Sequence, residues 1–135
     1  MPGQEMVRSC DWEVKSRCAS GSASVTFVGG VPAKVSVDSY YCGPRRGAPG
    51  YSCTVMYERS DKHSVWSEHG NTLVISNQES SPSQPDKLKL VIGKHISIDL
   101  DETPRVGNCG AGAELPRAIV IPEGEKVCRV WLFGP

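Results

Sequence analysis

The stretch His95-Ile96-Ser97-Ile98-Asp99-Leu100-Asp101 decides the fold class of this chain. Polar and apolar residues alternate along it without a break. An extended chain would therefore turn the aliphatic side chains to one face and the polar side chains to the other. An amphipathic helix would instead repeat its apolar residues every three or four positions. The stretch predicts a β-strand with one buried and one solvent-exposed face.

The same two-residue period recurs through most of the chain. It is clear in Lys87 to Ile92, and noisier runs, rich in Val and Ile, cover residues 22–28, 35–38, 51–58, 72–76, 117–121 and 126–133. No window carries the i, i+3, i+4, i+7 apolar pattern of an amphipathic helix. We expect about eight strands and at most a single helical turn, near residues 11–16 or 110–115.

Glycine-containing turns separate these runs in the order of the chain. Gly29-Gly30, Gly70-Asn71 and Glu123-Gly124-Glu125 are typical hairpin connections, and Gly93-Lys94 has the length of a two-residue type II′ turn. Longer connections cover residues 43–50 and 79–86. Strands joined in sequence order form an antiparallel meander. We therefore predict a single all-β domain, residues 1–135, that closes as a small barrel or a sandwich.

The net charge and the short apolar runs argue against two classes of partner, nucleic acids and membranes. The chain has 135 residues, enough for one modest core, and 15 acidic residues against 15 lysines and arginines. Proteins that bind nucleic acid through its phosphates, or anionic lipid through electrostatic attraction, normally carry a basic excess. The apolar runs are also too short to cross a bilayer. We expect neither nucleic acid nor a membrane as a partner.

The six cysteines indicate an oxidising compartment. Their number is even, and no two of them have the C-x-x-C spacing of zinc or thioredoxin-like redox sites. We therefore predict structural disulfides that staple the domain. Six cysteines allow fifteen pairings. Proximity along the chain favours Cys42 with Cys53, Cys109 with Cys128, and Cys10 with Cys18.

Disulfides point to export, and exported proteins normally begin with an apolar signal peptide. Residues 1–20 lack such a stretch. The two observations agree if the signal was removed from the mature chain. We expect a periplasmic or secreted protein.

Motifs for catalysis and metal binding are missing from the sequence. It has no G-x-S-x-G nucleophile elbow, no phosphate-binding loop and no dinucleotide-binding fingerprint. The histidines lie in polar surroundings typical of solvated strand ends; they are His63, His69 and His95. The acidic cluster from Asp99 to Glu102 lacks the ligand spacing of a calcium loop. We predict no catalytic residue, no metal site and no cofactor, and so no enzyme.

The connection between residues 40 and 53 is the leading candidate for a binding surface. It combines Tyr41, Arg45, Arg46 and Tyr51 with two prolines and a cysteine near each end. Tyrosine and arginine are enriched at the energetic centres of interfaces, and a stiffened loop loses less entropy on binding. The alternative is an ordinary long hairpin whose tyrosines pack on the core edge and whose arginines are solvated.

Trp66 is the second binding candidate because it lies beside a tight turn, although burial would explain it equally well. The segment Trp66-Ser67-Glu68-His69-Gly70 resembles the W-S/T-K-G segment of the bacterial inhibitors of c-type lysozyme, which are small disulfide-tied β-barrels. Glu68 and His69 replace the lysine region of that segment. No tyrosine follows Ser20-Gly21-Ser22 to complete the family's S-G-x-x-Y motif. The resemblance concerns size and fold class only.

These patterns favour an exported module that binds another protein, by inhibition or capture, without catalysis. The alternative is a carrier that holds a small ligand inside a β-barrel. An enclosed apolar cavity would favour the carrier, and a filled core would count against it.

Overall fold

The computed structural model describes residues 4–42, 50–104 and 115–132. These residues form ten strands and one short 3-10 turn, η1 (Lys15–Arg17). The strands are β1 (Glu5–Val14), β2 (Ala19–Val28), β3 (Val31–Tyr41), β4 (Tyr51–Glu58), β5 (Ser64–His69), β6 (Thr72–Asn77), β7 (Lys87–Ile92), β8 (Ile96–Asp99), β9 (Ala118–Ile121) and β10 (Arg129–Trp131).

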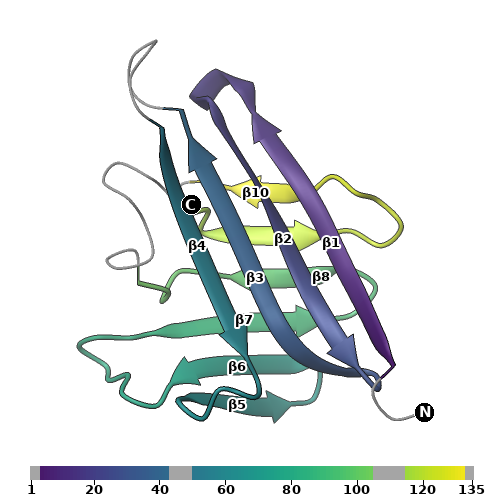
Figure 1. Ribbon diagram of the computed structural model, residues 1–135, viewed down its shortest axis with the longest axis vertical. Coiled ribbons are helices and arrows are strands. Elements are labelled where there is room, and N and C mark those ends of the chain that lie inside the picture. Colours follow the sequence, from purple (N-terminus) through teal and green to yellow (C-terminus); the bar gives the residue numbers. More distant parts are fainter. Residues whose placement is uncertain (1–3, 43–49, 105–114, 133–135) are drawn as a thin grey trace.

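The strands form two separate antiparallel sheets. The first has the order β1-β2-β3-β4, and the second has the order β10-β9-β8-β7-β6-β5. Neighbours in each sheet are also neighbours in the chain, so the predicted all-β, antiparallel class is confirmed, although the described strands form two meanders with ten strands in total instead of one meander with about eight. Figure 1 shows the sheets as two layers, one over the other, with the strands of one layer running across those of the other. The described strands do not close into one barrel.

Two strands, β1 and β5, were not predicted from the sequence. The alternation of β1 is obscured because Arg8 lies on its inner face with Cys10 and Trp12, while Val7 lies on the outer face. Arg8 tolerates this place because its Nη2 donates hydrogen bonds to the carbonyl oxygens of Lys94 (2.9 Å) and Pro122 (3.3 Å). The other missed strand, β5, is a largely exposed edge strand, so burial imposes little pattern on it.

A single helical turn overlaps the first of the two predicted windows, but only at its end. Most of residues 11–16 belongs to β1, and only η1 at its end is helical. These residues form a strand and not a helical turn because a strand turns both Trp12 and Val14 toward the other sheet, where Trp12 is buried and Val14 half-buried. Residues 110–114 of the second predicted turn lie outside the described residues.

The predicted hairpin turns are confirmed in position, and one is corrected in type. Gly29, Gly30 and Gly70 have φ of +59°, +80° and +63°, values that favour glycine. The link between β7 and β8 has three residues, because Ile92 pairs with Ile96. Its first residue, Gly93, does not have the positive φ that a type II′ turn requires, so that assignment was wrong.

Aliphatic side chains from both sheets form one core cluster. Ile96, Ile98 and Leu100 are at most 1% exposed, which confirms the faces predicted from the stretch at 95–101. Across the interior, Val25 and Val35 of the four-stranded sheet are also fully buried. The space between the layers is therefore occupied by side chains, which gives the outward-facing residues of both sheets a rigid support.

The cysteines form disulfides as predicted, but all three proposed pairings were wrong. Cys10 bonds to Cys128, and Cys18 bonds to Cys42. Cys53 is also disulfide-bonded, whereas Cys109 lies outside the described residues. Proximity along the chain failed because the meander brings distant strands together: Cys10 and Cys128 are separated by 118 positions, yet their Cα atoms are 5.1 Å apart.

The Cys10–Cys128 disulfide joins one edge of each sheet. Beside it, the Asp11 N–H donates to the Lys126 carbonyl (2.8 Å), and the Cys128 N–H donates to the Asp11 carbonyl (2.9 Å). These bonds form a parallel bridge between Asp11 and Val127. The two layers are thus tied at this corner by both backbone hydrogen bonds and a covalent link.

Candidate functional site

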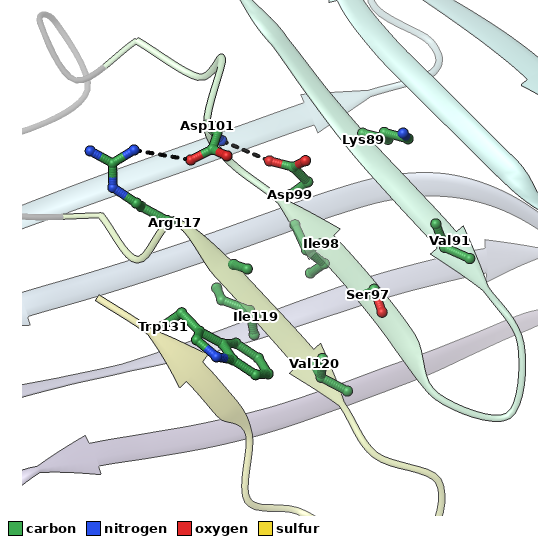
Figure 2. Close-up of a pocket in the computed structure, with 11 residues that line it drawn as sticks. Lys89, Val91, Ser97, Ile98, Asp99, Asp101, Arg117, Ile119, Val120 and Trp131 are labelled. Carbon is green, nitrogen blue, oxygen red and sulfur yellow. Dashed lines mark hydrogen bonds and ion pairs between the residues drawn. The ribbon is translucent and has the colours of Figure 1, made fainter. Parts of the chain in front are cut away.

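A hollow lies on the outer face of the six-stranded sheet. It has a volume of about 490 Å³ and is open to solvent on one side. Strands β7, β8, β9 and β10 and the segments next to them supply its lining: Lys89, Val91, Ser97, Ile98, Asp99, Asp101, Arg117, Ala118, Ile119, Val120 and Trp131. Figure 2 shows Trp131 at one end of the hollow, with Lys89 and Val91 at the other.

Strand register determines which side chains meet in the hollow. Lys89 lies opposite Asp99, Asp99 opposite Ala118, and Ala118 opposite Trp131, so these side chains form one row across four strands. A second row runs beside it through Val91, which lies opposite Ser97 on β8. Because side chains alternate between faces, all of these residues point away from the core.

Trp131 is the dominant apolar group of the hollow. Its side chain is 49% exposed, although a tryptophan is among the most costly residues to leave in water. Its cross-strand neighbour Ala118 has a small side chain, which leaves free space beside the indole. Val91 and Val120 continue the apolar floor away from the indole. An incoming apolar side chain would contact Trp131 and cover this floor.

Charged residues line the rim of the hollow. Arg117 and Asp101 form an exposed ion pair of 3.2 Å, and the Asp101 N–H donates to Asp99 Oδ1 at 2.9 Å. Lys89 has no ion pair with any residue that the structure describes, although it lies opposite Asp99. A second, more polar hollow of about 270 Å³ shares Lys89 and Asp99 and extends to Val74. The rim therefore offers both a cation and an anion to a partner.

The structure brings together only part of the predicted Tyr-Arg surface. Tyr41 is the last residue of β3, half-buried, and pairs in register with Tyr51, the first residue of β4. This pairing confirms that the two strands form a hairpin. Arg45 and Arg46 lie outside the described residues. Tyr41 does not line the hollow on the outer face of the six-stranded sheet.

Trp66 lies on the inner side of β5, opposite the buried Ile75. The Arg59 guanidinium stacks over the Trp66 ring, 4.6 Å from its centroid. The Nε1 of Trp66 donates a hydrogen bond to Ser64 Oγ at 3.0 Å. Arg59 also forms an ion pair with Glu68 (2.8 Å). The half-buried indole packs against the core. Trp66 therefore does not share a surface with Trp131.

Trp131 lies within the strand predicted at residues 126–133, but it was not predicted to be a binding residue. Its exposure follows from the partner strand: Val130 pairs with the buried Ile119, so the next residue must face outward. Alternation along residues 128–131 is the sequence signal for this orientation, because Cys128, just before β10, is buried and Val130 is half-buried.

Titratable groups do not converge in the described residues. No group of three or more His, Cys, Asp and Glu side chains is arranged to hold a metal ion within them. His95 Nδ1 accepts a hydrogen bond from the Glu123 N–H at 3.0 Å, so this histidine supports a turn. Among the described residues there is also no helix with the length and apolar character to span a bilayer.

Comparison with known proteins finds no match. No family model fits the chain, and no curated protein or solved structure is significantly similar to it. The resemblance of Trp66–Gly70 to a segment of the bacterial lysozyme inhibitors gains no support from these comparisons. The function of the protein must therefore be inferred from the geometry of its own structure.

Proposed function

We propose that the protein is a non-catalytic binding module that recognises another protein through the outer face of β7–β10. The half-exposed Trp131 beside the open hollow of about 490 Å³ carries this proposal. Tryptophan is the residue type most enriched among interface hot spots, especially where a pocket lies next to it. The cation and anion on the rim would orient the partner.

The scaffold supports such a role. The hollow lies on regular strands whose inner faces are packed against the core, so its side chains need little ordering when a partner binds. We interpret the two layers as a β-sandwich whose corner is closed by Cys10–Cys128. The disulfides are consistent with an oxidising environment, and we place the protein in the periplasm or outside the cell.

The Tyr-Arg connection remains a second proposed contact region. Tyr41 and Tyr51 lie at its base, while Arg45 and Arg46 belong to residues 43–49, which are not described. Inhibition or capture of a partner through this loop is compatible with binding on the sheet face, because Tyr41 at its base belongs to the four-stranded sheet and the hollow to the six-stranded sheet.

A carrier for a small ligand is the second candidate function, and its site would be the same hollow. The interior that a barrel carrier would use is lined by fully buried side chains, including Leu90, Ile98 and Ile119. The open hollow, in contrast, has the volume of a small-molecule site. A small apolar ligand could therefore lie against Trp131 in place of a partner side chain.

The decisive experiment compares Trp131→Ala with the matched control Met56→Ala. Met56 has nearly the same exposure, 51%, but lies on β4 of the four-stranded sheet, away from both proposed contact regions. Peptides selected from a phage-displayed random library against the oxidised protein serve as probes for a protein partner. We expect their affinity to fall at least about thirtyfold in Trp131→Ala, as for a hot-spot residue, and to be unchanged in Met56→Ala.

Other results of this experiment would redirect the assignment. Peptides that bind wild type and Trp131→Ala equally would remove the sheet face from the proposal. Failure to select any peptide, together with Trp131-dependent binding of the apolar dye 8-anilinonaphthalene-1-sulfonate, would favour the carrier.

A further inference from the structure

Over Glu5 to Ser9, no described residue pairs with the edge of β1 that faces away from β2. Hydrogen-bonded and non-hydrogen-bonded pairs alternate in an antiparallel ladder. The Gly29 N–H donates to the Gln4 carbonyl, so the next residue, Glu5, turns its backbone groups away from β2, as do Val7 and Ser9. Asp11 continues this alternation, and its outward groups are the ones bonded to Lys126 and Cys128.

No described residue pairs with the outward backbone groups of Glu5, Val7 and Ser9. Figure 1 shows β1 at the margin of the four-stranded sheet, with no described strand beside this half of it. The side chains of this half are also open, since Met6 is 55% exposed and Val7 is 50% exposed.

This edge has few of the features that protect other sheet edges. Natural proteins block an exposed edge with proline, a bulge, a covering segment, or charged side chains, including charges that point inward. Residues 5–9 contain no proline, and β1 pairs with β2 in unbroken register. Their charges are Glu5, at the end of the stretch, and Arg8, whose inward guanidinium is hydrogen-bonded to Lys94 and Pro122. The centre of the edge at Val7 is therefore open to another strand.

We propose that a second copy of the chain pairs with this edge, strand β1 against strand β1, around a twofold axis through Val7. In this antiparallel register Val7 lies opposite Val7 of the second copy, and Glu5 lies opposite Ser9. The outward backbone groups of Glu5, Val7 and Ser9 are then hydrogen-bonded on both chains. The antiparallel ladder pattern gives about six N–H···O=C bonds between the two copies. The two four-stranded sheets become one continuous sheet.

The position of Arg8 and the length of the free edge favour the register centred on Val7 over the registers centred on Arg8 or Met6. An axis through Arg8 would place two arginines directly opposite each other, which is unfavourable. An axis through Met6 would pair only Glu5 with Val7 and so form fewer hydrogen bonds. The bridge at Asp11 ends the free edge on one side, and β1 begins at Glu5 on the other. The free segment is therefore symmetric about Val7, as a twofold interface requires.

The first test compares Val7→Pro with the matched control Glu13→Pro by sedimentation equilibrium of the full oxidised chain. Both residues turn their N–H away from β2, so proline removes no bond of the β1–β2 ladder in either variant. We expect wild type and Glu13→Pro to form a dimer. In Val7→Pro the dissociation constant should rise at least about tenfold, since two interchain bonds are lost.

Either of two results would overturn the proposal: wild type that stays monomeric at millimolar concentration, or a folded Val7→Pro variant that dimerises as well as wild type. Circular dichroism shows whether each variant is folded. The sheet-face proposal is tested separately, because Trp131→Ala leaves this edge intact.

A second test examines the register without proline. Ser9→Glu places a carboxylate opposite Glu5 of the second copy at two symmetric positions and should weaken the dimer about tenfold. Adding Glu5→Lys to the same chain restores opposite charges and should restore the affinity. A double variant that remains as weak as Ser9→Glu would rule out the register centred on Val7.

Discussion

At the scale of the residue, Gly21 shows how a single position adapts a sheet to a large core side chain. Gly21 lies on β2 opposite Trp12, whose indole is buried. A Cβ atom at position 21 would overlap the indole ring and the carbonyl oxygen of Asp38. Glycine weakens most strands because it is flexible. Here it is required, since the Trp12 ring occupies the space of a side chain.

Gly21→Ala should therefore destabilise the protein by about 1–3 kcal/mol, the cost of overpacking a core. The matched control is Gly93→Ala, because a Cβ there meets nothing closer than 3.7 Å. That control should be neutral or slightly stabilising. Urea unfolding of both variants measures the difference. Equal stability of Gly21→Ala and wild type would show that Trp12 moves aside at no cost.

At the scale of the element, Tyr57 links β4 to the segment that precedes β7 in the other sheet. Its hydroxyl donates a hydrogen bond of 2.5 Å to Asp86 Oδ1. Burial, followed by this hydrogen bond and the negative charge of Asp86, raises the pKa of the Tyr57 phenol well above its ordinary value of 10.0. The neutral phenol is thus the form that the folded protein requires.

The raised pKa predicts a loss of stability in alkali. Below pH 10.0 the phenol is neutral in both the folded and unfolded states, and the link is intact. Above that pH the unfolded chain loses its proton first. The free energy of unfolding should then fall by up to about 1 kcal/mol per pH unit, allowing for solvent screening of the partly exposed ring.

The measurement is the pH dependence of urea unfolding between neutral and strongly alkaline solution. Tyr57→Phe should be less stable than wild type at neutral pH, because Asp86 loses its donor. Its stability should fall less steeply above pH 10.0. The same alkaline slope in both proteins would contradict this account.

At the scale of the whole molecule, the two disulfides whose cysteines are both described differ in accessibility and in the loop that each closes. Cys10 and Cys128 are 2% and 6% exposed, whereas Cys18 is exposed and Cys42 is half-buried. Their sequence separations are 118 and 24 residues. The chain-entropy model gives about 5 kcal/mol for the longer loop and about 3.5 kcal/mol for the shorter. The buried link between the sheets is thus the more important one.

Mild reduction of the native protein should open Cys18–Cys42 before Cys10–Cys128, because an attacking thiol or phosphine must reach the sulfur. Alkylation at short times, followed by peptide mass spectrometry, identifies the labelled residues. Label should appear first on Cys18 and Cys42, with the fold retained by circular dichroism. Early labelling of Cys10 or Cys128 would mean that the corner between the sheets opens readily.

The elements predictable from sequence were those whose two faces differ strongly. In β7 and β8 one face is aliphatic and mostly fully buried while the other is mostly polar, so alternation alone located them. In β1, Arg8 on the inner face and Val7 on the outer face remove that contrast. In β5 an edge position leaves most residues exposed. Alternation of polar and apolar residues reveals a strand only where its two faces differ in burial. In β1 and β5 the two faces differ too little for alternation to reveal them.

What the sequence determined by itself was the class of the protein: all-β, antiparallel, joined in chain order and cross-linked through cysteine. These properties follow from the two-residue period, the turn residues and the cysteine count, which are local or compositional. Only the tertiary structure decided that Cys10 meets Cys128, that Trp66 faces inward, and that Trp131 lies beside Ala118 over an open hollow. Such contacts depend on strand register and on how two sheets are layered, and both are set by packing between residues far apart in the chain.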